Sequence, residues 1–146
     1  MAEVLFESCI DSAASAAAAV SGGARRLELC ESLVEGGVTP SHGKIVAVMR
    51  AAAGVPVHVL VRPRPGDFAY SEDEYTAMIA DIDHCKRLGV TGIVSGVLLP
   101  DGSVDTVRTR RLIEASRPLR YCTTRTKCAR AHASAAPSAG SRSTVL

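Results

Sequence analysis

The stretch Val57–Tyr75 reads VHVLVRPRPGDFAYSEDEY and decides the fold. Its first six residues alternate in type: the odd positions are all valine, and the even positions are His58, Leu60 and Arg62. Side chains of a strand point alternately to its two faces, so one face is aliphatic and the other becomes polar toward the C-terminal end. We expect helices to cover the aliphatic face and a functional site to lie on the other.

The same strand-then-helix pattern recurs along the chain. Predicted strands span residues 3–9, 24–30, 55–62 and 90–98, and predicted helices span residues 12–22, 41–53, 71–88 and 105–117. This alternation indicates a parallel sheet with right-handed crossovers, as in open doubly wound sheets and in TIM barrels. Strands covered by helices on both faces are uniformly apolar, so the polar face favours the barrel. We predict an α/β fold, a partial (β/α)8 TIM barrel of about four βα units with a parallel sheet.

Charge divides the chain into two parts. The 146 residues carry a formal net charge of +2, but every acidic residue lies at or before Glu114. Residues 1–120 therefore have a net charge of −2, whereas residues 121–146 hold four basic residues and no acid. We predict a partial barrel over residues 1–120 and a divergent, disordered basic tail over residues 121–146.

The composition excludes several classes of partner. Four cations without interleaved aromatic residues are a poor nucleic-acid footprint, so we expect no nucleic-acid partner. No apolar run approaches the length of a membrane span, and the start MAEVLFESCIDS lacks the features of a signal peptide. The five cysteines are an odd number and suit a reducing compartment. We expect a cytoplasmic protein, with the nucleus as the alternative, and no membrane partner.

Five segments of the chain are long and specific: ESCIDS from Glu7, RRLELCESLVEGGVTPS from Arg25, VRPRPGDFAYSEDE from Val61, GVLLPDGSVDTVRTRRLIE from Gly96 and RPL from Arg117. Together they resemble the CutC copper-homeostasis family. The resemblance runs from Val4 to Leu119 in order. It implies a (β/α)8 TIM barrel in the cytoplasm with a role in copper handling.

The resemblance ends where the family continues into a strand with an FHRAFD-like motif. Here the chain reads RYCTTRTKCARAHASAAPSAGSRSTVL, and a complete barrel needs about 250 residues. We therefore expect a truncated form in which the family's function is impaired. A half-barrel leaves sheet edges and an inner face to be covered, so we expect either a homo-oligomer or pairing with a full-length copy.

Charged residues close to strand ends are the first candidate site. Two arginines beside a carboxylate suit a phosphate or carboxylate ligand, and two glutamates on neighbouring strands suit acid–base chemistry or hard metal ions. The alternative is a structural network of ion pairs. If the site is catalytic, we expect its residues to meet at the C-terminal mouth of the barrel, and they are Glu7, Glu28, Arg62, Arg64 and Asp67.

Cys9 and Cys30 are the candidate metal ligands. They share the inward parity of two neighbouring strands, which lie about 4.8 Å apart. Cu(I) prefers thiolate ligands, and the family resemblance makes copper the expected metal. The alternative is that both cysteines are small hydrophobic residues of the core. Of the other candidates, we expect His58 to be a satisfied core histidine, and Cys122 and Cys128 lack the spacing of a zinc site.

Three functions remain open at this point. The main hypothesis is a copper-homeostasis protein that binds Cu(I) through cysteine thiolates. The second is a TIM-barrel enzyme acting on an anionic small molecule, for which Arg62 and Arg64 would supply the binding charge. The third is a truncated product without function of its own.

Overall fold

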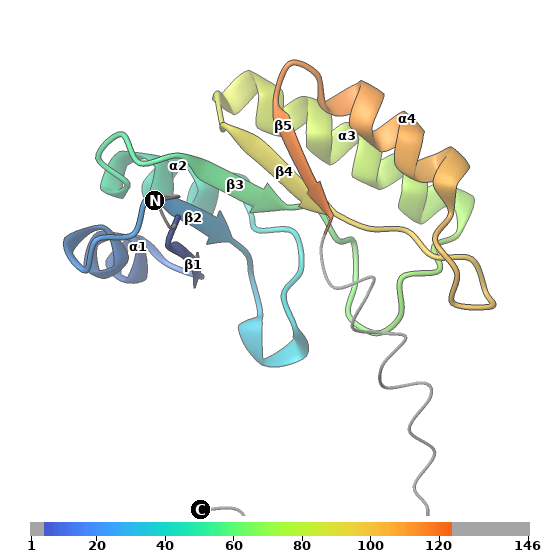
Figure 1. Ribbon diagram of the computed structural model, residues 1–146, viewed down its shortest axis with the longest axis horizontal. Helices are drawn as coiled ribbons and strands as arrows, with labels where there is room; N and C mark the ends of the chain where they lie inside the picture. The colour runs from blue at the N-terminus through green and yellow to red at the C-terminus, as the bar shows by residue number, and fades with distance from the viewer. Residues whose placement is uncertain (1–4, 124–146) are drawn as a thin grey trace, which may run out of the picture.

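The computed structural model describes residues 5–123 (Figure 1). Strands alternate with helices along this part of the chain, with one short 3-10 helix after the second strand. The elements are β1 (Glu7–Ile10), α1 (Ala13–Ser21), β2 (Arg26–Leu29), η1 (Leu33–Glu35), α2 (His42–Ala51), β3 (Val57–Leu60), α3 (Glu72–Leu88), β4 (Gly92–Ser95), α4 (Thr106–Ser116) and β5 (Arg120–Thr123).

The strands form one parallel sheet in sequence order, β1-β2-β3-β4-β5. Each strand from β1 to β4 is followed by a helix that returns the chain to the start of the next strand, which gives the four predicted βα units. In Figure 1 the strands lie side by side, with α2 and α3 behind them and α1 and α4 at the two sides of the view. Sequential parallel strands with helices on a single face are the arrangement of a barrel wall.

The core confirms the alternation read from Val57 to Arg62. Val57, Val59 and Val61 belong to one large cluster that also includes buried residues of all four α-helices. This cluster lies between the sheet and the helices and is the outer layer of the barrel wall. The opposite face carries a small cluster of Cys30, Leu60 and Val94. The sheet is therefore strongly apolar on its helix side and mixed on its inner side.

Capping residues explain where the helices begin. Ser71 accepts from the backbone N–H of Glu74, and the Glu74 side chain accepts from the backbone N–H of Ser71 at 2.8 Å, which is the predicted capping box. Asp105 caps α4 by accepting from the Arg108 N–H. Such caps each contribute about 1 kcal/mol. Gly89 ends α3 with φ of +76°, a conformation that glycine adopts readily.

The strand β5 was not predicted. The predicted tail begins at residue 121, but β5 pairs with β4 through Arg120–Thr123. The strand is held because Tyr121 packs against the outer core and Cys122 against the inner cluster. The expected disordered tail otherwise falls on residues 124–146, outside the described residues. Within residues 5–123, none of the helices has both the length and the apolar character that a membrane span requires.

Candidate functional site

The inner face of the sheet is organised in rows set by the strand register. One row runs across the whole sheet and consists of Cys9, Glu28, His58, Gly92 and Arg120. Toward the C-terminal ends, the next row consists of Cys30, Leu60, Val94 and Cys122, the residues of the inner cluster. Cys9, Cys30 and Cys122 thus share the inner face. Cys9 contacts Cys30 on the β1–β2 side, and Cys122 contacts His58 on the β3–β5 side.

Cys9 and Cys30 meet as the inward parity predicted. Their Sγ atoms are 3.3 Å apart, between β1 and the end of β2. Cys9 is exposed, whereas Cys30 is only 1% exposed and directs its thiol to the backbone carbonyl of Ile10 at 3.7 Å. One thiol of the pair is therefore accessible to solvent and the other is fixed beneath it.

The loop after β2 holds Cys30 in place. Glu31 and Val38 bridge the two arms of this loop by reciprocal backbone hydrogen bonds, so that it folds back over the strand end. A Cβ at Gly37 would lie 2.8 Å from Leu60 Cδ2 and 3.1 Å from Cys30 Cβ, and its φ is +87°. Both the close approach and the backbone conformation require glycine at this position.

Two carboxylates, Glu28 and Asp11, place negative charge near the thiol pair. The hydrogen bond to Cys9, burial, and the charges of Cys9, Glu28 and Asp11 all raise the pKa of the Cys30 thiol. The carboxylates oppose a second negative charge at the sulfur atoms but favour a cation there. The pair therefore loses its protons most readily when a metal ion replaces them.

The geometry of the pair fits a soft metal ion. Metal–thiolate bonds are about 2.3 Å long, so two sulfurs lie about 3.8 Å apart in a tetrahedral arrangement and about 4.6 Å apart in a linear one. The observed 3.3 Å has to widen by about 0.5 Å or more, which rotation of the exposed Cys9 side chain allows. Within residues 5–123, no three side chains of His, Cys, Asp or Glu come together to hold a metal. A metal ion bound by the pair would have two sulfur ligands.

The predicted gathering of Glu7 and Glu28 with the arginines at the C-terminal mouth is wrong. Glu7 is the first residue of β1 and forms an ion pair with Arg26, the first residue of β2. At about 3.3 Å per residue, the register puts Glu7 about 20 Å from the level of Arg62. Glu28 lies in the middle of the inner face, between Cys9 and His58. The strands begin later than the sequence indicated, which shifts both glutamates toward the N-terminal end.

Arg62 binds the backbone of two loops. It is 6% exposed, and its two terminal nitrogens donate to the carbonyls of Gly37 at 2.7 Å, Glu35 at 3.2 Å and Gly66 at 2.7 Å. Its guanidinium also lies over the Phe68 ring, 4.8 Å from the centroid. These contacts fix the loops that follow β2 and β3. Both terminal nitrogens of Arg62 therefore already have partners and are not available to bind an anion.

Arg64 and Asp67 are brought together as predicted. Arg64 donates to Asp67 Oδ1 at 2.9 Å and to Glu74 Oε1 at 2.5 Å, and it also contacts the carbonyl of Ala69. The hydrogen bond from Arg64 lowers the pKa of Asp67, and the pKa of Glu74 is lowered by the Ser71 backbone and by Arg64. This network joins the β3–α3 loop to the capping box of α3.

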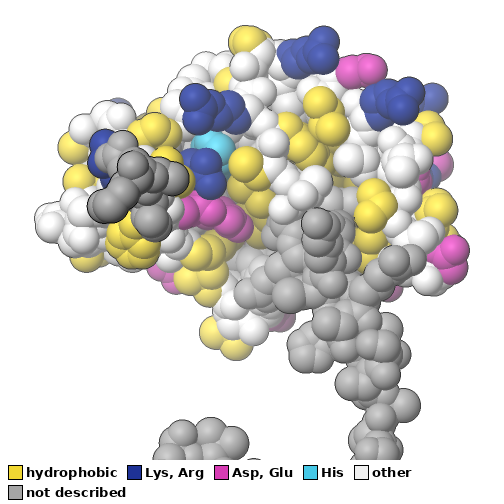
Figure 2. All heavy atoms as spheres, in the orientation of Figure 1, with side chains coloured by type: hydrophobic (Ala, Val, Ile, Leu, Met, Phe, Trp, Pro, Cys, Tyr) yellow, Lys and Arg dark blue, Asp and Glu magenta, His cyan; other side chains and the backbone are white. Residues whose placement is uncertain are grey.

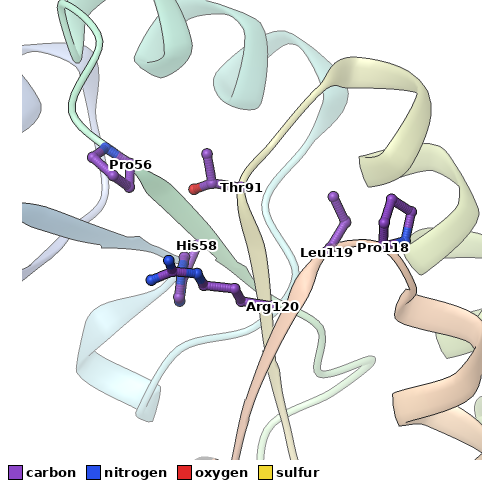
Figure 3. Close-up of a pocket in the computed structure, with 6 residues that line it drawn as sticks. All are labelled: Pro56, His58, Thr91, Pro118, Leu119 and Arg120. Atoms are coloured by element: carbon purple, nitrogen blue, oxygen red, sulfur yellow. The ribbon is translucent and has the colours of Figure 1, made fainter.

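Sequence reasoning missed a second contact on the inner face. His58 was expected to be a satisfied core histidine, but its Nδ1 lies 3.7 Å from Cys122 Sγ, and its Nε2 has no hydrogen-bond partner among the described residues. His58 also lines a hollow of about 320 Å³ with Pro56, Thr91, Pro118, Leu119 and Arg120 (Figure 3). The parity of β3 placed His58 inward, but without a predicted β5 nothing in the sequence placed Cys122 beside it.

Comparison with known proteins supports the family resemblance. The CutC family model matches residues 4–131. The chain is 46% identical over 115 residues to the CutC family protein of Parabacteroides distasonis, covering 79% of this chain and 47% of that protein. It is 50% identical over 115 residues to the CutC family protein of Mesorhizobium japonicum, covering 79% and 44%. The chain spans about half the length of the curated relatives it matches.

Solved structures confirm the predicted fold class. The crystal structure of CutC from Streptococcus agalactiae, whose name assigns it to copper homeostasis, is similar with a TM-score of 0.76 and 28% identity. The match covers 82% of this chain and 59% of that chain. A protein from Burkholderia cenocepacia named as a phosphonomutase has a TM-score of 0.54 at 21% identity, over 77% of this chain and 46% of that one, which shows the fold alone. The described part of the chain is a partial (β/α)8 barrel.

Proposed function

Because the chain belongs to the CutC family, we propose that it takes part in copper handling and binds Cu(I) through Cys9 and Cys30. The observation that carries this proposal is the 3.3 Å separation of the two sulfur atoms across β1 and β2. Thiolates are the ligands that Cu(I) prefers, and two of them are sufficient for a soft monovalent ion. Copper is here the cargo of the protein rather than a resident cofactor.

The two cysteines and the nearby carboxylates have different roles in the proposed binding. Cys9 is exposed and meets the incoming ion first, and buried Cys30 then supplies the second sulfur. Each thiol gives up its proton on binding, so affinity rises with pH. The charges of Glu28 and Asp11 stabilise the added positive charge. Because both cysteines belong to β1 and the end of β2, the proposed site is local to the first two strands.

The predicted anion clamp is not part of this proposal. Arg62 donates its hydrogen bonds to backbone carbonyls, and Arg64 forms ion pairs with Asp67 and Glu74. These contacts support the alternative of a structural ion-pair network and give no support to an enzyme that binds its substrate through these arginines. The expected pairing with a second copy or with a full-length chain stays a prediction.

A competition titration tests the copper proposal. Purified protein is titrated with Cu(I) under anaerobic, reducing conditions against a chromogenic chelator, with wild type, Cys9→Ser, Cys30→Ser and the double variant. We expect one Cu(I) per chain in the wild type and a loss of affinity of at least about 100-fold in the double variant, because metal sites depend on their first ligands. Cys122→Ser is the matched control, since it removes another thiol of the inner face.

The titration has one outcome that supports the proposed copper site and one that contradicts it. Loss of binding in the double variant together with full binding in Cys122→Ser supports the proposed pair. Unchanged Cu(I) affinity in the double variant contradicts it and returns Cys9 and Cys30 to the role of small core residues.

A further inference from the structure

A thiol and an imidazole meet at the other side of the inner face. Cys122 on β5 is half-buried, and its Sγ lies 3.7 Å from Nδ1 of His58 on β3. His58 is only 1% exposed, and its second nitrogen, Nε2, is buried without a partner among the described residues. A buried polar atom without a partner destabilises a fold, and such groups recur at functional sites.

Gly92 makes this contact possible. The strand β4 lies between β3 and β5, and Gly92 stands in the same row as His58. A Cβ at Gly92 would lie 2.5 Å from His58 Cδ2 and 2.6 Å from Nε2. The imidazole therefore occupies the space above β4 that a side chain would otherwise fill, and it crosses that strand to reach Cys122.

Two arginines, Arg26 and Arg120, place positive charge near His58. Burial lowers the pKa of His58, and the charges of Arg26 and Arg120 lower it further, while Glu7 opposes them. The hydrogen bond to Glu7 raises the pKa of Arg26, and Cys122 adds a smaller effect in the same direction, so this ion-paired guanidinium lies within electrostatic reach of the thiol. In Figure 3 the Arg120 side chain extends from β5 toward His58. Figure 2 shows a histidine side chain between basic side chains on this face, with acidic ones beside them.

The hollow beside His58 offers room for a small ligand. Its volume of about 320 Å³ is at the lower end of small-molecule sites, and Arg120 and His58 are its polar side chains together with Thr91. Pro56, Pro118 and Leu119 complete the lining. His58 therefore connects two features: it lines the hollow and it contacts the Cys122 thiol.

We propose that Cys122 is a reactive nucleophile with His58 as its base, and that it takes small electrophiles that carry a carboxylate or a phosphate. A thiol within hydrogen-bond reach of an imidazole is the arrangement of an activated cysteine. Cations beside the pair attract anions, and they disfavour a metal ion at this place. This inference does not depend on copper binding by Cys9 and Cys30.

The chemical step is a simple substitution. The thiol proton passes to His58 Nδ1, which requires the neutral ring to carry its own hydrogen on Nε2. The thiolate electron pair forms the S–C bond, and the bond from carbon to the leaving group breaks with its electrons on that group. With iodoacetate as the probe, the products are S-carboxymethyl Cys122, iodide and protonated His58.

Alkylation followed by peptide mass spectrometry tests the proposal. The reduced protein is treated with iodoacetate or with neutral iodoacetamide, and the rate is read separately at Cys122 and at Cys9. We expect the ratio of iodoacetate to iodoacetamide rates to be several-fold higher at Cys122 than at Cys9. His58→Gln is expected to slow both reagents at Cys122 by at least about tenfold, because it removes the base. Cys85 is the internal control for folding, because it is buried and becomes reactive only when the protein unfolds.

A second variant guards against failure to fold. Arg120 is exposed, so Arg120→Gln leaves the core intact. We expect it to lower the reagent ratio at Cys122 to the value at Cys9 while the iodoacetamide rate changes little. Equal reagent ratios at Cys122 and Cys9 in the wild type overturn the proposed preference for anions. An unchanged Cys122 rate in folded His58→Gln overturns the proposed base.

Discussion

Two sulfur-containing pairs on one face of the sheet differ in the charge around them. Cys9 and Cys30 lie on the β1–β2 side with the carboxylates of Glu28 and Asp11 nearby. His58 and Cys122 lie on the β3–β5 side with Arg120 and the ion pair of Arg26 and Glu7 nearby. Each pair joins one inward-facing residue of the Cys9 row to one of the Cys30 row. Their places in the sheet are therefore equivalent and do not explain why one pair would bind a cation and the other an anion.

The comparison teaches that local charge separates a cation site from an anion site. Negative charge beside two thiols favours replacement of their protons by a metal ion. Positive charge beside a thiol and a neutral imidazole attracts anionic reagents and repels a metal ion. A change that alters one pair, or the charge beside it, is expected to leave the other pair unchanged.

The largest expected effect comes from Gly92→Ala, which breaks the second pair. The new Cβ displaces the His58 ring, which lies 2.5 Å from its position, and such overpacking destabilises folded proteins by about 1–3 kcal/mol. Denaturant unfolding gives the change in the free energy of unfolding, and alkylation gives the Cys122 rate, which should fall. Gly43→Ala in α2 is the matched control, since nothing lies within 4 Å of its Cβ. Equal stability of the two variants contradicts the close packing of His58 over β4.

A smaller effect is expected from Glu28→Gln, which removes charge beside the first pair. The Cu(I) affinity should fall about threefold to tenfold, because one charge a few Å away contributes on the order of 1 kcal/mol. The chelator competition assay measures this change. Asp73→Asn, an exposed residue of α3, removes the same charge from the surface and should have no effect. An equal loss in both variants would show that net charge, rather than the local carboxylate, determines affinity.

The smallest expected effect is a pH dependence carried by His58. Because its pKa in the folded protein lies below the ordinary 6.5, the unfolded chain binds the proton more strongly. This contribution to stability is complete above about pH 6.5 and is lost as the pH falls toward the folded value. Unfolding curves from pH 7.5 to 5 should therefore show a steeper loss in the wild type than in His58→Gln. Parallel curves would contradict a buried, neutral imidazole.

The sequence predicted the barrel wall well because that wall depends on local patterns. The alternation of Val57 to Arg62, the capping box at Ser71 and the inward parity of Cys9 and Cys30 are all set by residues close in the chain. The family resemblance is confirmed by the comparisons.

Three features could not be predicted, for physical reasons. The four residues of β5 carry little pattern of their own and are held by Tyr121 and Cys122 packing on distant elements. The contact of His58 with Cys122 joins residues far apart in the sequence and depends on a glycine between them. The partners of Arg62 are backbone carbonyls, which no pattern of residue types reveals.

The difference between the two pairs is tested most directly by mapping cysteine protection by copper. The reduced protein is alkylated with iodoacetate, with and without one equivalent of Cu(I), and each cysteine is quantified by peptide mass spectrometry. Cys85 is the internal reference, because burial raises its pKa to about 12 and should keep it unreactive in both samples. We predict that Cu(I) protects the exposed Cys9 and leaves Cys122 reactive, while Cys30, which is buried like Cys85, is unreactive in both samples. Protection of Cys122 to the same extent as Cys9 would contradict the account.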